Sequence, residues 1–499
     1  MTRTALASLL SLLSGVATLT FVVVAILRLD HPFELEWVEG FFVEIVARVR
    51  DGKAIYVEPS LDFISCIYTP LYFYVSAAVG EGFAALRAVS LLATLGSCGV
   101  LFGMAWRETR SHWPGWLAAG TFAAAFAASG AWYDLARVDS LFLFLLLLGM
   151  ATLRAARSGW GVAVSALFVT LSFLTKQTAL AVALPVAIWL LLADWRRGAL
   201  WGGLIGALVV ASTLALDASS GGWYRFYVFE FQPQRAFEAW KLTGFWTTDL
   251  LATVPVACAA ALLLVWRTLR DPGGWDRFFF LAWAAAAVGA AYVARAQSGG
   301  YLNNLMPAYA LLALLLALSA HREAAALAAG RPRPGLLEVA IFVACALQLV
   351  HLAEDPRQWL PTPGDTATGE RLVETIAGIP GEVLIADQGY LATRAGKRSY
   401  AHGVMLWDIA RSDRPALQRG LAREIETALR EQRFGAVVLS DGWFSVSPSL
   451  ERYYEKERSL LDDSERFWPV TGARVRPAHL YRPRDAPVAT RPARRAPGQ

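Results

Sequence analysis

The segment from residue 31 to residue 72 carries seven acidic side chains and stands between two long apolar runs. Glu36 and Glu39 are three residues apart at the start of a helix-like stretch, so their carboxylates are expected on one helix face. A carboxylate near a helix N-terminus and a bilayer could act as a general base that draws a proton from a hydroxyl. The alternative is structural, because acidic side chains favour helix N-termini and cap them.

Charged side chains also interrupt the apolar runs further along the chain. Arg137 and Asp139 form an R-x-D motif where two runs meet, which is a costly place for charge. They could orient a substrate or cation, or form a structural ion pair at a helix end. Lys176, followed by Gln177, could hold a phosphate as a point charge or extend its ammonium towards the interface. Further cations expected on the same outer face are Arg225, Arg235, Lys241 and Arg295.

The composition is that of a multi-span membrane protein. The 499 residues are 56% hydrophobic and 17% charged, whereas roughly a quarter of the residues in soluble domains are charged. The net charge is only +5, and the arginines sit in short clusters between apolar runs, which indicates membrane topology rather than nucleic-acid binding. The four cysteines form no C-x-x-C or Cys/His cluster, so neither a disulfide framework nor a zinc site is expected.

Apolar length and the positive-inside bias together predict an all-α membrane domain with eleven spans and a cytoplasmic N-terminus. The predicted spans are residues 7–29, 84–106, 115–133, 140–155, 159–175, 178–193, 199–217, 249–267, 277–294, 303–320 and 335–353. The first external loop covers residues 30–83. Within it, residues 41–52 are predicted to form an amphipathic helix on the membrane that ends at Gly52, and the aromatic segment 68–83 is predicted to lie in the outer interface.

The composition changes near Glu354 to a mixed, charged sequence that contains proline. Residues 1–353 are therefore assigned to the membrane domain, 354–485 to a small extracytoplasmic α/β domain, and 486–499 to a disordered tail rich in proline and arginine. Within the α/β domain the patterns predict strands over 382–387 and 434–441 and a helix over 415–433. The polar residues at or near the strand ends, which could contact an acceptor or be ordinary loop groups, are Asp387, Gln388, His402 and Asp441.

Several short motifs, taken in order and on one predicted face, resemble the GT-C superfamily of membrane glycosyltransferases. The resemblance is to its branch of protein mannosyltransferases, aminoarabinose transferases and lipopolysaccharide-core transferases, and it covers about residues 1–350. The motifs are Glu39-Gly40, Tyr68-Thr69-Pro70-Leu71-Tyr72, Arg137-Val138-Asp139, Lys176-Gln177 and Tyr301-Leu302-Asn303-Asn304-Leu305-Met306-Pro307. Many members have Asp-Glu where this chain has Val38-Glu39, and an acid or Lys before the first-loop proline, where this chain has Tyr68-Thr69.

The resemblance implies an enzyme of a bacterial inner or plasma membrane. It would take a hexose or pentose from a polyprenyl-phosphate carrier on the extracytoplasmic face and pass it, with inversion, to a lipid, glycan or protein hydroxyl. Glu39 would be the base, with Glu36 as the competing candidate, and Asp139 the second acid. The substrate-binding residues carried over or placed on the same face are Arg137, Lys176, Gln177, Tyr68, Tyr72, Arg225, Arg295, Tyr301 and Asn303.

The motifs require no cofactor, although magnesium or manganese between Glu39 and Asp139 would suit carboxylates and a phosphate. The expected partners are the lipid-phosphate donor, the acceptor and membrane lipids, without nucleic acid. The alternative function is a multi-span transporter or lipid flippase, but no internal repeat of the kind many transporters show is evident. A third interpretation, in which the spans anchor a C-terminal binding module, would not need eleven of them.

Overall fold

The computed structural model describes residues 2–231, 236–270, 278–329, 333–440, 449–462 and 467–485. Arg235, Asp441 and the predicted disordered tail lie outside these residues. The chain divides into two compact units, of which the first comprises Met1–Asp30 and Ile67–Leu360 and the second His31–Cys66 and Pro361–Gln499. By packing, the acidic first loop therefore folds with the C-terminal segment, whereas the sequence-based boundary divides the chain once, near residue 353.

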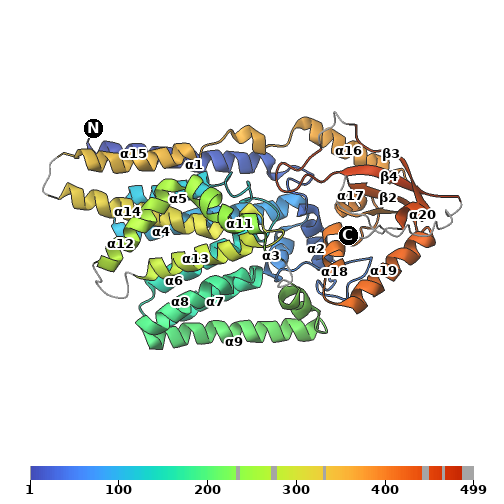
Figure 1. The fold of residues 1–499 in the computed structure, drawn as a ribbon, viewed down its shortest axis with the longest axis horizontal. Coiled ribbons are helices and arrows are strands. Elements are labelled where there is room, and N and C mark those ends of the chain that lie inside the picture. The colour runs from blue at the N-terminus through green and yellow to red at the C-terminus, as the bar shows by residue number, and fades with distance from the viewer. Residues whose placement is uncertain are drawn as a thin grey trace, which may run out of the picture. The chain divides into compact units, whose positions relative to one another are not determined.

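The first unit is built from helices throughout its described residues (Figure 1). The longer ones are α1 (Arg3–Leu29), α4 (Gly82–Thr109), α5 (His112–Ala124), α6 (Asp139–Ala155), α7 (Gly159–Thr175), α8 (Thr178–Ala193), α9 (Trp195–Ser219), α12 (Pro255–Arg270), α13 (Phe279–Ala296), α14 (Met306–Ala328) and α15 (Leu336–His351). The shorter ones are α3 (Leu71–Val79), α10 (Trp223–Arg225), η1 (Phe226–Glu230), α11 (Ala239–Gly244), η3 (Phe245–Ala252), η5 (Leu302–Leu305) and η6 (Pro356–Trp359).

Most of these helices coincide with predicted spans. Helices α7 and α8 have the predicted limits, because the Ser158 side chain caps the first and Lys176 leaves the helical conformation between them. Helix α5 is shorter than predicted. It ends at Ala124, and a tight turn with positive φ at Gly130 and Ala131 follows instead of further helix. Helix α3 has nine residues, too few to cross a bilayer at about 1.5 Å per residue, so segment 68–83 is not a helical span.

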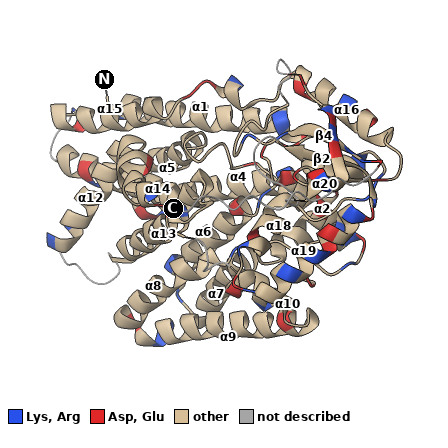
Figure 2. Ribbon diagram, turned by 45° about the vertical axis from the view of Figure 1, so that its right-hand side comes forward, with Lys and Arg blue, Asp and Glu red and all other residues tan. Residues whose placement is uncertain are grey.

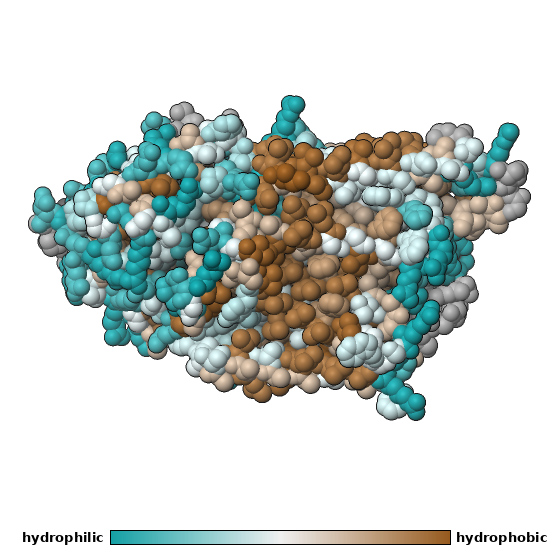
Figure 3. All heavy atoms as spheres, turned by 180° about the vertical axis from the view of Figure 1, so that it is seen from behind, coloured by the Kyte–Doolittle hydropathy of each residue, from teal (hydrophilic) through white to brown (hydrophobic). Residues whose placement is uncertain are grey.

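Five helices in the described residues are long and apolar enough to cross a membrane, or up to seven if each of two bent pairs is one span. Helix α14 is the most enclosed of the five, with 89% of its apolar window buried, whereas only 11% of the window of α9 is buried. Large apolar side chains such as Leu12 and Leu214 are exposed, and Figure 3 shows a broad hydrophobic band on one face. A surface of this kind fits a lipid environment, because lipid requires no polar covering. The full count of eleven spans stays a prediction.

A buried ion pair ties the end of α1 to the loop that follows α5. The Arg28 guanidinium, which is fully buried, donates from Nε to Asp134 Oδ2 at 2.7 Å and from Nη2 to the Ala131 carbonyl at 2.7 Å. Two hydroxyls hold the next turn of the same loop, since Thr94 and Ser140 both donate to the Tyr133 carbonyl, at 2.7 and 2.6 Å. The loop that leads to the R-x-D motif is therefore fixed from three helices.

The second unit has a four-stranded sheet in the order β1-β2-β4-β3. Its elements are α2 (Glu39–Arg50), α16 (Pro363–Ala377), β1 (Glu382–Ile385), α17 (Gly389–Arg394), α18 (Gly403–Ala410), α19 (Pro415–Arg430), β2 (Phe434–Ser440), α20 (Leu450–Tyr453), β3 (Tyr454–Ser459) and β4 (Pro477–Pro483). Strands β1 and β2 are parallel, with Leu384 opposite Val437, and helices α17 to α19 form the crossover that a parallel pair requires. The two predicted strands and the predicted helix are thus confirmed.

In the second unit, apolar side chains face the core and charged side chains face outward. Helix α19 buries Leu421 and Ile425 and exposes the charged residues seen along it in Figure 2. The edge strand β3 exposes five consecutive residues, among them Glu455 and Lys456. Charged side chains on an edge strand discourage pairing with another chain, so β3 closes the sheet on that side.

The first loop is part of the core of this second unit. Helix α2 buries Phe41, Phe42, Ile45 and Val46, and it contacts α17. The expectation that α2 lies on the membrane is therefore wrong for its apolar face, which is covered by protein. Further along the loop, the Ala401 amide donates to the Leu61 carbonyl at 2.9 Å.

Candidate functional site

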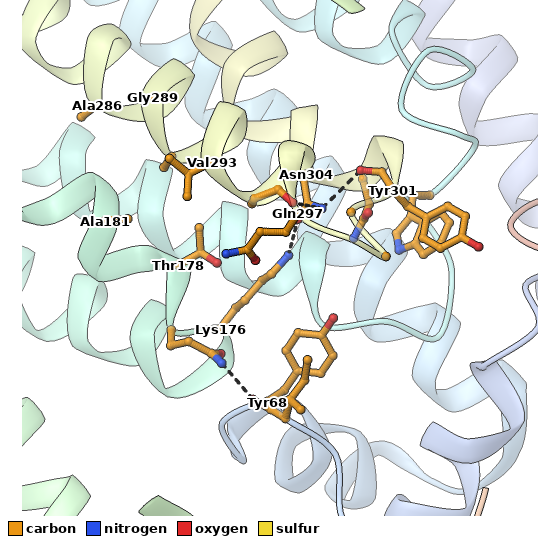
Figure 4. A pocket seen from close by; sticks show the side chains of 18 of the residues that line it. Tyr68, Lys176, Thr178, Ala181, Ala286, Gly289, Val293, Gln297, Tyr301 and Asn304 are labelled. Carbon is orange, nitrogen blue, oxygen red and sulfur yellow. Dashed lines mark hydrogen bonds between the residues drawn. The ribbon is translucent and has the colours of Figure 1, made fainter. Parts of the chain in front are cut away.

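A cavity of about 770 Å³ lies in the first unit. Its polar end is formed by the segment before α3, the loop before α6, the junction of α7 and α8, and the residues between α13 and α14. Its apolar end runs between α8 and α13. The polar residues that line it are Tyr68, Trp132, Arg137, Lys176, Gln177, Thr178, Gln297, Ser298, Tyr301, Asn303 and Asn304. Figure 4 shows Lys176 pointing towards Asn304, with Tyr68 on the near side.

Asp139 is the centre of a buried hydrogen-bond network beside this cavity. Its Oδ1 accepts from Lys176 Nζ at 2.7 Å and from Asn303 Nδ2 at 3.0 Å, and its Oδ2 accepts from Trp132 Nε1 at 3.1 Å. The side chains of Asp139 and Lys176 are 3% and 9% exposed. Because both carboxylate oxygens are occupied by donors, Asp139 is placed to hold the cation and the amide rather than to accept a proton from a substrate.

The Lys176 ammonium is directed by several groups at once. It donates to Asn304 Oδ1 at 3.2 Å and lies 5.9 Å from the centre of the Tyr68 ring and 5.8 Å from that of Phe142. An ammonium held by one carboxylate and one amide, at the wall of a cavity, keeps a fixed position and can meet a further anion there.

Two neighbours complete the polar end. The Gln177 amide donates to the Ile67 carbonyl at 2.9 Å, and this bond fixes the backbone segment just before Tyr68. The Arg137 guanidinium lies 5.4 Å from the centre of the Trp132 ring, and that ring stacks on Tyr301 with centroids 5.9 Å apart. The cavity therefore has two cations, Arg137 and Lys176, among its polar lining.

The apolar end is lined by small side chains. From α8 come Ala181 and Pro185, and α13 contributes Ala282, Ala285, Ala286, Gly289, Ala290 and Val293. A Cβ added at Gly289 would meet nothing within 4 Å, so the space beside this residue is open. The sequence of α13 is rich in alanine and contains Gly289, and this composition was the signal that could have located the groove.

Three of the predicted substrate-binding residues do not line the cavity. Tyr72 is fully buried and donates to the Leu86 carbonyl at 2.9 Å. Arg295 is paired with Asp249 at 2.9 Å, and the exposed Arg225 lies 3.3 Å from Glu230. The six that do line it are Tyr68, Arg137, Lys176, Gln177, Tyr301 and Asn303. Sequence reasoning did not single out Trp132, and it placed Asn304 in a motif without assigning it to the site; both hold the network.

The two candidate bases, Glu36 and Glu39, belong to the second unit and are almost completely buried there. Glu39 is the first residue of α2, and its Oε2 accepts from the Leu35 amide at 2.7 Å. Glu36 accepts from the Val38 amide at 3.3 Å, and Glu34 accepts from the Gly40 amide at 2.9 Å. Glu34 thus binds an amide in the first turn of α2 and Glu36 the amide of the residue before the helix, whereas Glu39 reaches back to the loop at Leu35. Only the Glu34 contact satisfies an amide of the first helical turn, as the structural alternative expects of acidic residues at a helix start. Their catalytic role stays a prediction.

Steric crowding explains why position 40 of the Glu39-Gly40 motif is a glycine. A Cβ at Gly40 would lie 2.1 Å from Tyr390 Cδ1 and 2.7 Å from Glu34 Oε1. No side chain fits at such distances, because the ring of Tyr390 in α17 packs directly on the backbone of α2. The motif therefore secures contact between the first loop and the C-terminal segment of the second unit.

Burial raises the pKa values of Glu34, Glu44 and Asp387 in the second unit. Burial raises the pKa of Glu34 well above its usual range, and the nearby charges of Glu36, Glu39 and Asp387 raise it further, against the lowering effect of the Gly40 amide. Burial also raises the pKa of Asp387 to about 6, although the Ser440 hydroxyl lowers it in part. These carboxyls bind protons more tightly in the folded protein than in the unfolded chain.

The residues present do not form a metal site at Asp139. In the described part of the chain, no three His, Cys, Asp or Glu side chains come together in a way that could hold a metal ion. A divalent cation at Asp139 would have to displace the Lys176 ammonium and two further donors. Magnesium or manganese between Glu39 and Asp139 therefore has no support from the donor set of Asp139.

Comparison with known proteins finds a shared fold without a detectable sequence family. No protein-family model matches the sequence, and no curated protein sequence does. Crystal structures of ArnT from Cupriavidus metallidurans, bound to undecaprenyl phosphate and in the apo state, match with TM-scores of 0.56 and 0.58 at 16% and 14% identity, over 94% of this chain and 97% of theirs. The oligosaccharyltransferase AglB from Archaeoglobus fulgidus, in complex with an inhibitory peptide and a dolichol-phosphate, matches with a TM-score of 0.52 at 12% identity, over 88% and 72%.

We predict that Asp139 and Lys176 are strongly coupled in stability. Either Asp139→Asn or Lys176→Met alone should lower the free energy of unfolding by about 3 kcal/mol or more, because each leaves a buried charge without its partner. The double variant should recover most of this loss. Thermal or denaturant unfolding of the purified chain in detergent measures the four members of the cycle. Additive losses in the double variant would contradict the coupling.

We predict that Asp387→Asn stabilises the protein at high pH only. Because the folded pKa of Asp387 is raised to about 6 from 3.8, its contribution to stability is fully present below pH 4 and is lost as the pH rises through 6. The variant should therefore unfold at a higher temperature than wild type at pH 8, by the equivalent of about 3 kcal/mol at most, and at the same temperature at pH 4. The control is Asp413→Asn, which removes an exposed carboxylate. A lower unfolding temperature for Asp387→Asn at pH 8 would refute the prediction.

Proposed function

We propose that this chain, which has the GT-C fold of membrane glycosyltransferases, is itself a glycosyltransferase that takes a monosaccharide from a polyprenyl-phosphate donor. The observation that carries the proposal is the cavity of the first unit, in which a groove of small apolar residues continues into a polar end with two cations, Arg137 and Lys176. A lipid phosphate has the same two parts in the same order. The lipid phosphates bound in the ArnT and AglB structures support this ligand class.

The apolar groove suits a prenyl chain. Its α13 wall runs from Ala282 to Ala294, a rise of roughly 18 Å at 1.5 Å per residue. Alanine and glycine leave room for the methyl branches of an isoprenoid, and their apolar lining removes the chain from water. The phosphate would then lie at the polar end, where Lys176 and Arg137 neutralise it.

The chemistry that follows is a single displacement. The oxygen of an acceptor hydroxyl attacks the anomeric carbon, the bond from that carbon to the phosphate oxygen breaks, and the phosphate leaves with the electron pair. Charge grows on the leaving oxygen, so a fixed cation stabilises the transition state more than the ground state. In this scheme Lys176 and Arg137 bind the leaving group. Asp139 and Asn304 position Lys176, and Asn303 holds Asp139.

The proton of the acceptor hydroxyl needs a base, and we assign this role to Glu39, with Glu36 as the alternative. The reaction is assigned to the extracytoplasmic face of a bacterial inner or plasma membrane, where the arginine clusters place the outer loops. The acceptor is a lipid, a glycan or a protein hydroxyl. Transport or flipping of a lipid phosphate is the competing function, since it would use the same cavity without chemistry.

A transfer assay tests the proposal. Purified protein in lipid vesicles is offered radiolabelled polyprenyl-phosphate sugars with total membrane extract as the acceptor. Wild type should form a new labelled product, and Glu39→Gln and Lys176→Met should each lower kcat/KM by about 100-fold or more. Because Lys176→Met also leaves Asp139 unpaired, the stabilised double variant is assayed beside it.

The matched control is Lys53→Met, which removes an exposed lysine that pairs with the exposed Asp51. It should retain wild-type activity. Transfer that survives in Glu39→Gln would move the base to Glu36 or elsewhere. A folded wild-type protein that transfers no label, but exchanges the lipid between leaflets, would replace the proposal with the flippase.

A second prediction concerns the lipid chain. Gly289→Leu should fill the groove without a backbone clash, because nothing lies within 4 Å of an added Cβ. It should raise KM for undecaprenyl-linked donors by about tenfold or more, with a smaller effect on donors that carry one or two isoprene units. The control is Gly206→Leu in α9, where an added Cβ also meets nothing. Equal effects on long and short donors would show that the groove does not hold the chain.

A further inference from the structure

Strands β1 and β2 of the second unit end side by side and place two polar residues together. Their parallel register pairs Ile385 with Val438. Asp387 and Ser440 each follow two residues later, so they lie at the same carboxyl edge of the pair. In open α/β sheets, the carboxyl ends of parallel strands are where ligands bind. The residues at this edge are therefore candidates for contact with a ligand.

The polar groups at this edge are buried, and several of their atoms have no hydrogen-bond partner among the described residues. Asp387, Gln388 and Ser440 are 2%, 2% and 7% exposed. Within the described residues, both Asp387 oxygens, the Gln388 amide nitrogen and the Ser440 hydroxyl have no partner in hydrogen-bonding geometry, although Ser440 is close enough to lower the pKa of the Asp387 carboxyl. Leaving a buried polar group unpaired costs about 1 to 3 kcal/mol, so a cluster of them is kept at a cost to stability.

His402 adds a donor next to this cluster. The Gly403 amide donates to the Ala386 carbonyl at 2.6 Å, which places His402 beside the end of β1. Its Nδ1 accepts from the Val404 amide at 3.2 Å, so the proton of the neutral ring is on Nε2. The ring centroid lies 5.3 Å from that of Phe41 and 6.4 Å from that of Trp37. Aromatic rings around a few convergent polar groups are typical of small-molecule sites.

The mixture of groups restricts the chemistry of the ligand. The described residues hold no group of acids and histidines that could bind a metal. An inorganic anion is disfavoured by the charges of Asp387 and of Glu34, which interact with each other. A simple cation would satisfy Asp387 but leave the amide donor of Gln388 unused. A hydroxyl donates to a carboxylate and accepts from an amide at the same time, and neighbouring hydroxyls on one ring do so repeatedly.

We propose that Asp387, Gln388, Ser440 and His402 form a binding site for the hydroxyl groups of a carbohydrate, and that the acceptor of this protein is a glycan. The role as acceptor site rests on the proposed glycosyltransferase function, whereas the binding of sugar does not. The aromatic rings of Trp37 and Phe41 form its apolar wall, and the four polar side chains select the hydroxyl pattern.

The test separates binding from transfer. Saturation-transfer NMR measures the binding of methyl glycosides of glucose, galactose and mannose to the full chain in nanodiscs, without any donor. Wild type should bind at least one of them, and Asp387→Asn and Ser440→Ala should each weaken its binding by about tenfold. Asp413→Asn, at an exposed position, is the control and should bind as wild type does. Thermal unfolding of every variant shows that it is folded.

The outcomes decide between alternatives. Unchanged binding in Asp387→Asn and Ser440→Ala, or no binding of any glycoside by wild type, would overturn the site. Binding of a serine-containing peptide or of inorganic phosphate in place of sugar would overturn the ligand class. In the transfer assay, the two variants should raise KM for a glycan acceptor at saturating donor and leave KM for the donor unchanged. Sugar binding without any transfer would support the carbohydrate site and contradict the glycosyltransferase function. Transfer with an unaltered KM for the acceptor would support the glycosyltransferase function and contradict the acceptor site.

Discussion

The polar end of the cavity in the first unit depends on the buried ion pair between Asp139 and Lys176. Two charges inside an apolar helical bundle are tolerated only when they are paired and their remaining hydrogen-bonding positions are filled. Asp139 opens α6, Lys176 separates α7 from α8, and Asn303 precedes α14, so one carboxylate joins three parts of the chain that lie far apart in sequence. The same requirement keeps an ammonium at the cavity wall, and the site for an anion is therefore a consequence of how the bundle is stabilised.

The acidic first loop belongs to the second unit, and its carboxylates stabilise backbone structure there. Its carboxylates bind backbone amides of the loop and of the first turn of α2, and Gly40 allows the Tyr390 ring to pack on that helix. Several of these carboxyls lie close together in an interior that disfavours charge, which explains the raised pKa of Glu34. The capping interactions and the electrostatic strain are both present, so the motif has a structural reason whatever chemistry Glu39 performs.

The sequence was sufficient for local structure and insufficient for long-range partners. Apolar length and the arginine clusters predicted the limits of α7 and α8, and in the structure Ser158 and Lys176 mark their ends. The motifs also predicted the fold and six residues of the cavity. Periodicity carries no information on distant contacts, so it placed the apolar face of α2 on the membrane, where the structure buries it in protein. For the same reason Trp132 was missed, since its bond to Asp139 depends on a turn with positive φ at Ala131.

The second unit is discontinuous, because residues 31–66 are separated from their partners by nearly three hundred residues of helical bundle. A ribosome adds about 5 to 20 residues per second, so roughly 15 to 60 s pass between the synthesis of the loop and that of the strands it packs with. During this interval Phe33, Leu35 and Trp37 have not yet met the core that later buries them. Biogenesis of this protein thus includes a waiting period in which an aromatic, aggregation-prone segment has already left the ribosome, and its yield in the cell depends on how that segment is sheltered until the last quarter of the chain arrives.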